Sequence, residues 1–99
     1  MRLPKSQEVL GKKFKVSIKL IDGAIGEFHP SRGITISPVI QDSDYDTLQT
    51  FFHECFHAVL YRSGISMQLS PELEESIVDV SATWLTDNLE RLVRILEIE

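Results

Sequence analysis

The sequence predicts a single α+β domain in which a small antiparallel β-sheet of about three strands packs on two helices. Short segments between residues 14 and 37 alternate apolar and polar side chains and end at turn residues, which is typical of half-buried strands. From about residue 45 onward, apolar residues recur at helical spacing. The 99 residues, 42% of them hydrophobic, suffice for one core but not for a second domain. We therefore expect residues 1–99 to form one domain.

The charge of the chain is unevenly distributed. The net charge is −5, but residues 1–20 carry about +5 and the remainder about −10. Because the basic residues are interleaved with an alternating strand, they are more typical of a solvated face than of a nucleic-acid surface, and we predict no nucleic-acid partner. No segment has the apolar length of a signal peptide or a membrane span, and the single Cys55 allows no disulfide within the chain. These features predict a cytoplasmic protein without a membrane partner.

The first forty residues are expected to hold the sheet. Pro4 followed by Gly11 favours a short helical turn over residues 4–10. Three strands are then predicted at residues 14–20, 24–28 and 34–37, with turns at residues 22–23 and 30–33. Because the connections are short, an antiparallel meander is the simplest arrangement.

A long helix is predicted over residues 45–62. Ser43 and Asp46 have the spacing of a capping box, with Asp in place of the usual Glu or Gln, and Gly64 suits the left-handed position after the helix. At 100° per residue, apolar and polar side chains fall on separate sides. The expected core side holds Leu48, Phe51, Phe52, Cys55, Phe56, Val59 and Leu60. The expected polar side holds Thr50, His53, Glu54, His57 and Tyr61.

A second helix is predicted to begin at Pro71, with Ser70 as its N-cap, and to run through Trp84. At Asp87 the sequence allows either continuation of this helix or the start of a new one. An apolar stripe at helical spacing near the C-terminus is expected to face the core or to form a homo-oligomer surface, and its members are Leu89, Leu92, Val93 and Leu96.

The first predicted helix contains the motif H-E-x-x-H, formed by His53, Glu54 and His57. Histidines four residues apart lie one above the other on a helix, so their imidazoles can bind one Zn²⁺ at about 2.0–2.1 Å. Glu54 lies at the edge of the same face, where it can reach a water activated by the metal without being a ligand itself. The motif therefore predicts a zinc-dependent hydrolase.

A catalytic zinc requires a third protein ligand, and the sequence restricts the choice. There is no histidine after His57, and Leu60 and Ser63 stand where the metzincin pattern H-E-x-x-H-x-x-G-x-x-H requires Gly and His. The remaining candidates are downstream carboxylates, the upstream His29 and Cys55. Of these, Cys55 is expected to point to the wrong side of its helix.

Among the downstream carboxylates, Glu75 and Asp79 are four residues apart and share one helical face. One can then bind zinc while the other accepts the N–H of a ligand histidine and fixes its tautomer. Glu72 and Glu74 are competing ligands, and the helix dipole alone favours an acidic first turn. We favour Glu75 because only this glutamate is followed by an aspartate four residues later.

H-E-x-x-H followed on a separate helix by E-x-x-x-D resembles the gluzincin family of zinc metallopeptidases. The small size and the order of strands, active-site helix and glutamate helix are most similar to minimal gluzincins and to the ImmA/IrrE-like peptidases, many of them phage or prophage proteins. The resemblance implies a zincin-like fold in which Glu75 completes the zinc site with His53 and His57. It also implies that Glu54 is the general base and that Asp79 orients His53.

We therefore predict a zinc-dependent peptidase that hydrolyses a peptide or protein substrate. Zn²⁺ is expected to polarise the scissile carbonyl, and Glu54 to take a proton from the activated water and pass it to the leaving amine. Tyr61, one turn beyond His57, and His29 in a loop are candidates for stabilising the oxyanion, although both positions are also typical of surface residues. Residues 34–37 are the expected exposed strand edge along which a peptide lies.

A function of a different class stays open. It is a catalytically silent, zinc-stabilised binding or regulatory module of the same fold, which contacts a partner protein through the basic strand or the C-terminal apolar stripe. A third hypothesis is a latent peptidase blocked by its own terminus or by a neighbouring molecule. Only catalysis requires Glu54, so replacing this residue separates the enzyme from the binding module.

Overall fold

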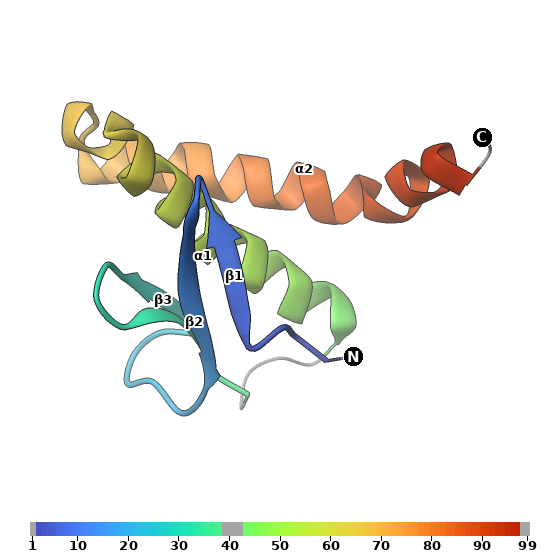
Figure 1. Cartoon of the computed structure of the whole chain (residues 1–99), viewed down its shortest axis with the longest axis horizontal. Coiled ribbons are helices and arrows are strands. Elements are labelled where there is room, and N and C mark those ends of the chain that lie inside the picture. The colour runs from blue at the N-terminus through green and yellow to red at the C-terminus, as the bar shows by residue number, and fades with distance from the viewer. Residues whose placement is uncertain (1, 39–42, 98–99) are drawn as a thin grey trace.

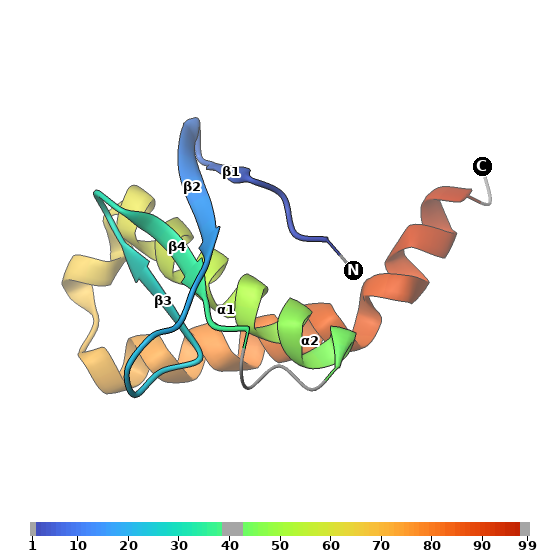
Figure 2. The same ribbon diagram turned by 90° about the horizontal axis from the view of Figure 1, so that it is seen from below.

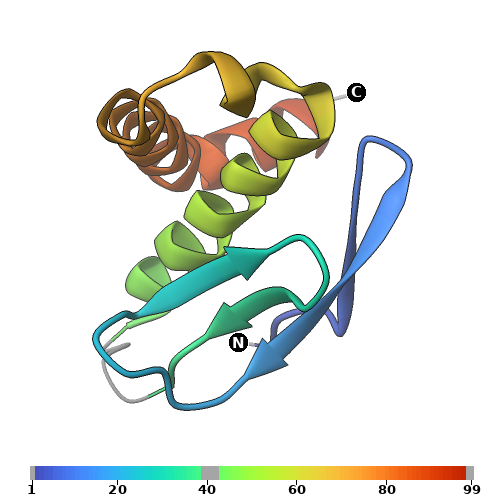
Figure 3. The ribbon, with the colours of Figure 1, turned by 90° about the vertical axis from the view of Figure 1, so that its left-hand side faces the viewer.

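The computed structural model describes residues 2–38 and 43–97 as a four-stranded sheet, a central helix and a second long helix (Figure 1). The elements are β1 (Ser6–Val9), β2 (Lys12–Ile18), β3 (Gly26–His29), β4 (Gly33–Ile36), α1 (Asp44–Ser63), the 3₁₀ turn η1 (Ile65–Gln68) and α2 (Pro71–Glu97). The helix α1 lies between the sheet and α2, which gives three layers (Figure 2, Figure 3). The predicted α+β class is confirmed.

The strand order differs from the predicted meander. The order is β1-β2-β4-β3, with β2 parallel to β4 and the other two pairs antiparallel. The strand β4 is therefore interior, and the predicted exposed edge at residues 34–37 is wrong. Placing β4 between two strands buries Ile34 and Ile36 completely against α1. This burial stabilises the central position of β4, and the local alternation of residues 34–37 does not indicate it. The exposed edge on this side of the sheet is β3.

The N-terminal segment forms a strand, so the helical turn predicted over residues 4–10 is wrong. β1 and β2 form a hairpin whose two turn residues, Leu10 and Gly11, have φ angles of 47° and 84°. Such a turn requires positive φ, so Gly11 serves the hairpin and not the end of a helix. The hairpin buries Val9 beside Phe14.

The helix α1 begins and ends within one residue of the predicted bounds. Ser43 Oγ accepts a hydrogen bond from the backbone N–H of Asp46 at 3.2 Å and donates one to its carboxylate at 3.0 Å. Gly64 follows the helix with a φ of 82°, and its N–H donates to the carbonyl of Tyr61. Both predicted caps are confirmed.

The main core lies between the sheet and α1 and contains Val16, Ile34, Ile36 and Phe51. Phe52 and Cys55 border this cluster, in agreement with the predicted core side of α1. Thr50 and Glu54 were predicted on the polar side, yet both are buried. The reason is the close approach of β3, because a Cβ on Gly26 would lie 2.7 Å from Thr50 Cγ2.

The helix α2 packs on the other side of α1 through Val78 and Ala82, which are fully buried. Ser70 Oγ accepts the N–H of Leu73 at 3.1 Å, as expected for the predicted N-cap, and the segment continues as one helix to Glu97. Its last turns extend away from the rest of the chain (Figure 1, Figure 2). The predicted C-terminal stripe is therefore split between half-buried Leu89 and Leu92 and exposed Val93 and Leu96. Within residues 2–38 and 43–97, neither helix is apolar enough over a sufficient length to cross a membrane.

Candidate metal centre

The histidine pair of α1 faces α2 and not the sheet. His53 and His57 lie one turn apart, with ring centroids separated by 5.0 Å. Both side chains are mostly buried between the two helices. Since residues four apart on a helix lie one above the other, both imidazoles meet the same part of α2.

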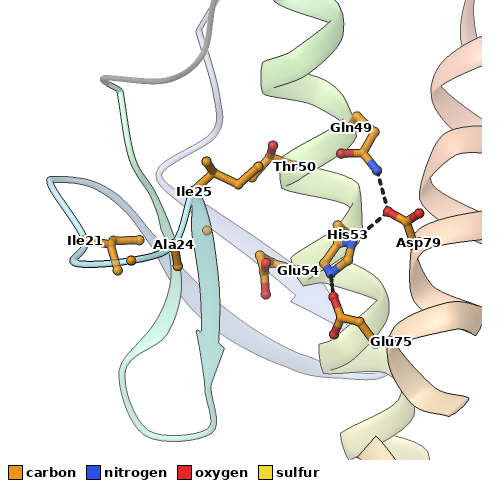
Figure 4. Close-up of a pocket in the computed structure, with 11 residues that line it drawn as sticks. Ile21, Ala24, Ile25, Gln49, Thr50, His53, Glu54, Glu75 and Asp79 are labelled. Carbon is orange, nitrogen blue, oxygen red and sulfur yellow. Dashed lines mark hydrogen bonds and ion pairs between the residues drawn. The ribbon is translucent and has the colours of Figure 1, made fainter. Parts of the chain in front are cut away.

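Glu75 is the α2 residue that meets both rings. Its Oε1 lies 2.7 Å from Nε2 of His53, and its Oε2 lies 3.1 Å from Nε2 of His57. One ligand atom from each of the three residues can be chosen so that all lie within 4.8 Å of one another. Figure 4 shows Glu75 reaching from α2 toward His53. The structure thus brings the three predicted ligands together.

Asp79 lies one turn beyond Glu75, beside the other nitrogen of His53. Its Oδ1 is 3.6 Å from Nδ1 of His53 and accepts a hydrogen bond from Gln49 Nε2 at 3.2 Å (Figure 4). The long distance to the imidazole makes this a weaker contact than that of Glu75. The placement agrees with the orienting position that the sequence predicts for Asp79.

Glu74, predicted as a competing ligand, instead lies on the far side of His57. Its Oε2 is 2.7 Å from Nδ1 of His57, and its other oxygen accepts a hydrogen bond from Ser66 in η1. Burial alone raises the pKa of Glu74, but the hydrogen bonds from Ser66 and His57 outweigh this effect, so its pKa lies below the usual value. The ionised carboxylate of Glu74 is therefore suited to accepting a hydrogen bond from His57 and holding its ring in place.

The arrangement of donors and acceptors around the two imidazoles fits a bound metal ion. A neutral imidazole carries one N–H, yet His53 and His57 both have carboxylate oxygens near both ring nitrogens. With the N–H on Nδ1, toward Asp79 or Glu74, each Nε2 lone pair faces the carboxylate of Glu75. Two acceptors at this separation require a further proton or a cation between them. Two imidazole nitrogens and one carboxylate are a known donor set of catalytic zinc, so the residues fit this ion.

Glu54 lies on the opposite side of His53, toward β3. Only 6% of this residue is exposed, and its carboxylate has no hydrogen-bond or ion-pair partner among residues 2–38 and 43–97. Burial raises the pKa of Glu54 to about 7; nearby His57 opposes this rise, whereas Glu75 and Glu27 add to it. An unpartnered buried carboxylate costs folding free energy, which points to a functional role.

Two cavities meet at this group of residues. One of about 530 Å³ extends from His53 and Glu54 toward the loop of residues 21–25 (Figure 4). The other, of about 370 Å³, extends past Phe28 to Tyr61. Both are lined by Gly26, His53, Glu54 and Glu75. The cavities therefore form two arms on either side of the candidate metal centre.

Of the three remaining candidate residues, one lies beside this centre and two lie elsewhere. Tyr61 lines the smaller cavity, and its ring centroid is 5.7 Å from that of Phe28. His29 does not line either cavity, and its Nδ1 instead lies 2.9 Å from Ser31 Oγ. Cys55 borders the sheet core, where burial raises the pKa of its thiol to about 12. The structure brings Tyr61 to the site but not His29 or Cys55.

Three residues that shape the site were not predicted. Gln49 lies four residues before His53, so i, i+4 spacing along α1 was an available signal. Gly26 interrupts a strand pattern, which often marks a close backbone approach. Ser66 lies in η1, where no local pattern indicates a contact with Glu74.

The sequence and the fold were compared with known proteins. No protein-family model, no curated protein and no solved structure matches this chain. The functional assignment therefore depends on the residues of the site and their geometry.

Proposed function

We propose that this protein is a zinc-dependent peptidase of the gluzincin type. The observation that carries the proposal is the convergence of two imidazole nitrogens and the Glu75 carboxylate beside a buried, unpartnered carboxylate, that of Glu54. His53, His57 and Glu75 would hold the ion. A bound zinc would supply Lewis-acid chemistry at this position, polarising the scissile carbonyl and making the attacking water more acidic.

Glu54 is the residue that moves the proton. It borders both cavities and therefore lies next to any peptide bond held between them. Its buried carboxylate has no hydrogen-bond or ion-pair partner among residues 2–38 and 43–97, so both oxygens are available to take a proton and return it. Glu54 would accept the proton at a carboxylate oxygen and deliver it to the leaving amine.

The substrate is a peptide in extended conformation that adds to the free edge of β3. This strand pairs with β4 on one side and with no other described strand. Gly26 lies at this edge and borders both cavities, so a peptide hydrogen-bonded along β3 passes Glu54 and His53. The edge of β3 replaces residues 34–37 as the substrate edge.

Tyr61 is the candidate donor to the oxyanion. It lines the smaller cavity together with His57 and Glu54. A hydroxyl at this position can donate a hydrogen bond to the developing negative charge. We expect Tyr61→Phe to lower kcat with little change in zinc content, and unchanged kcat would remove Tyr61 from this role.

The deciding experiment compares wild-type protein and Glu54→Gln in a library of unstructured peptides, both loaded with zinc. Loss of the proton-transferring group is expected to lower kcat by about 10²–10⁴-fold while zinc content is preserved. Glu72→Gln is the matched control, because this exposed glutamate of the first turn of α2 lines neither cavity. Equal cleavage by wild-type protein and Glu54→Gln would contradict the proposed role of Glu54.

A binding module that keeps the zinc but cleaves nothing is the second candidate. The observation that favours it is the large exposed apolar surface of α2, which includes Val80 at 69% and Trp84 at 58% exposure. Zinc-loaded wild-type protein that leaves the entire peptide library intact would support this candidate over the peptidase.

A further inference from the structure

A groove of about 420 Å³ lies on the outer face of the sheet, the face turned away from α1. Val16 and Ile34 point toward α1, so the residues that alternate with them along β2 and β4 point outward. The groove is lined mainly by these outward residues and by the turn between β3 and β4. Its charged members are all basic, namely Lys12, Lys13, Lys15, Lys19 and Arg32. We call this feature the basic groove.

The five cations of the basic groove are not neutralised by neighbouring acids. All five residues are exposed, and none forms an ion pair within residues 2–38 and 43–97. In strand register, Glu8 lies opposite Lys13. Glu27 lies opposite Thr35, yet neither glutamate lines the groove. Because like charges held close together repel one another, an anion in the groove is favoured by all five cations.

The base of the basic groove carries a hydroxyl that lacks a partner. Thr35 lines the groove, is only 4% exposed and makes no side-chain hydrogen bond to any residue that the structure describes. Ser17 lies beside it in the register of β2 and β4 and also lines the groove. A buried hydroxyl without a partner costs folding free energy, which a ligand oxygen recovers by accepting its hydrogen bond. Hydroxyl donors at the base and cations around them suit a carboxylate.

The basic groove adjoins the candidate metal centre at Pro30. This residue lines both the groove and the smaller of the two cavities beside His57. The strand β3 begins at Gly26, which borders the site, and ends one residue before Pro30. A chain that lies along the free edge of β3 therefore meets the groove where it leaves the site.

We propose that the basic groove binds an acidic segment of an extended polypeptide through its carboxylates. The position of this segment in a substrate, before the cleaved bond, rests on the proposed peptidase function, whereas its binding to the groove does not. An antiparallel partner of β3 runs from Pro30 toward Gly26, and antiparallel pairing is slightly more stable than parallel pairing. Each residue of a strand spans about 3.3 Å, so acidic side chains are expected from about four residues before the cleaved bond.

The charge of the rest of the molecule directs an acidic segment to this face. The helix α2 lies across α1 from the sheet and carries six acidic and no basic side chains over residues 71–90 (Figure 3). An acidic chain is thus repelled by α2 and attracted by the outer face of the sheet. Acidic side chains are therefore favoured at the basic groove and not beside α2.

The basic groove is less suited to nucleic acid or to a bilayer. Its one aromatic residue, Phe14, is 2% exposed and packs in the core, so the groove offers no ring to stack on a base. A flat anionic bilayer can contact the exposed cations but not the buried hydroxyl of Thr35. An extended polypeptide can reach both and can continue into the site.

Fluorescence anisotropy tests binding on the full chain in the presence of a metal chelator, so that no cleavage intervenes. The probe is a short labelled peptide with a block of Asp and Glu residues, and its counterpart carries Asn and Gln at the same positions. We expect the acidic peptide to bind about tenfold or more tightly than its counterpart. The difference should shrink as salt rises from about 50 to 300 mM. Equal affinities at low salt would overturn the proposal.

Lys15→Glu and Arg32→Glu are each expected to weaken binding of the acidic peptide by about fivefold or more, because each removes an attraction and adds a repulsion. Both residues are exposed, so the fold should be kept, and circular dichroism checks this. Arg91→Glu is the matched control, since this exposed arginine lies on α2 and its replacement makes the same change in net charge. An equal loss in Arg91→Glu would indicate a general effect of net charge and overturn the proposal.

Thr35→Val tests the base of the groove without changing its charge. The variant removes the unpaired hydroxyl and keeps the β-branched shape, so we expect stability at least equal to that of the wild type. Binding of the acidic peptide should weaken by about two- to tenfold. Anionic lipid vesicles and single-stranded DNA should bind more weakly than the peptide and be unaffected by this change. Tighter binding of either probe than of the acidic peptide would assign the cations to that partner and overturn the proposal.

The position of the segment has a separate test with zinc-loaded protein. Two peptides share one cleavable core, selected from the peptide library, and carry the acidic block either before or after it. The block before the core is expected to lower KM by about tenfold, and Lys15→Glu should abolish this advantage. A preference for the block after the core would overturn the antiparallel placement.

The two measurements separate the basic groove from the proposed function. Glu54→Gln should cleave neither peptide yet bind the acidic peptide as the wild type does. Acidic peptide that binds at the groove but is never cleaved would contradict the peptidase and leave the groove supported. Cleavage without binding of, or preference for, the acidic peptide would overturn the groove and support the peptidase.

Discussion

Glu74 Oε2 lies 2.7 Å from Nδ1 of His57, and the next residue, Glu75, contacts Nε2 of the same ring at 3.1 Å. The N-terminal end of α2 therefore presents carboxylates to both nitrogens of one imidazole. This relationship assigns different roles to two adjacent glutamates. Glu75 meets both histidines as a ligand would, whereas Glu74 fixes the tautomer and orientation of His57.

Glu74→Gln is expected to weaken zinc affinity by about 10–100-fold, because an amide holds the Nδ1–H of His57 less strongly than a carboxylate does. The stoichiometry at saturating zinc should stay unchanged. A competition titration with a zinc-binding dye measures the change. Glu72→Gln is the control, and equal affinities for Glu74→Gln and Glu72→Gln would argue against the orienting role.

Gly26→Ala tests the close approach of β3 to α1. The added Cβ would lie 2.7 Å from Thr50 Cγ2 and 3.1 Å from Glu54 Oε2, so the strand or these side chains must move. We expect a loss of about 1–3 kcal/mol in the free energy of unfolding, measured with urea, and a lower kcat at unchanged zinc content. The additional change Thr50→Ser removes the nearest atom and should recover much of the stability. Wild-type stability and kcat in Gly26→Ala would show that this approach is not required.

The stability of the metal-free protein should depend on pH through Glu54. Burial raises the pKa of Glu54 from its ordinary value of 4.5 to about 7, so the folded state binds this proton more tightly than the unfolded state. The free energy of unfolding should therefore fall as pH rises from about 4.5 to 7, with a total effect of about 3 kcal/mol.

Glu54→Gln removes this titration while keeping the size of the side chain. In the presence of a chelator, the variant should be more stable than the wild type at pH 8 and equally stable near pH 4.5. Urea unfolding at the two pH values measures the difference. A stability difference that is the same at both values would exclude Glu54 as its source.

Cys55 should resist alkylation in the folded protein. With a pKa of about 12, only about one thiol in 10⁴ is ionised at pH 8, and the side chain is partly buried as well. Reaction with iodoacetamide, followed by mass spectrometry, is expected to be slow in native buffer and fast in denaturant. Equal rates in the two conditions would contradict the placement of Cys55 at the sheet core.

The candidate site was predictable where it depends on helical spacing. His53 and His57 on one helix, and Glu75 and Asp79 on another, are pairs whose relative placement follows from four-residue spacing alone. The orienting contact of Glu74 with His57 depends instead on how the N-terminal end of α2 packs on α1. No local sequence pattern specifies this packing.

The sheet was less predictable because strand pairing is non-local. The alternation of residues 34–37 is the same for an edge strand and for the central strand that β4 proves to be. Gly11 was also ambiguous, since a helix end and a two-residue hairpin turn both use a glycine with positive φ. Tertiary packing of Ile34 and Ile36 against α1 decides the first case, and pairing of β1 with β2 decides the second.

The central claim is that His53, His57 and Glu75 bind one zinc ion. Metal analysis by mass spectrometry, after loading with zinc and removal of excess, tests it directly on wild-type protein beside His53→Ala, Glu75→Ala and the control Glu72→Ala. We predict about one equivalent of zinc in the wild type and in Glu72→Ala, and a large loss in the other two variants. Wild-type protein without stoichiometric zinc, or Glu75→Ala with undiminished zinc, would contradict the account.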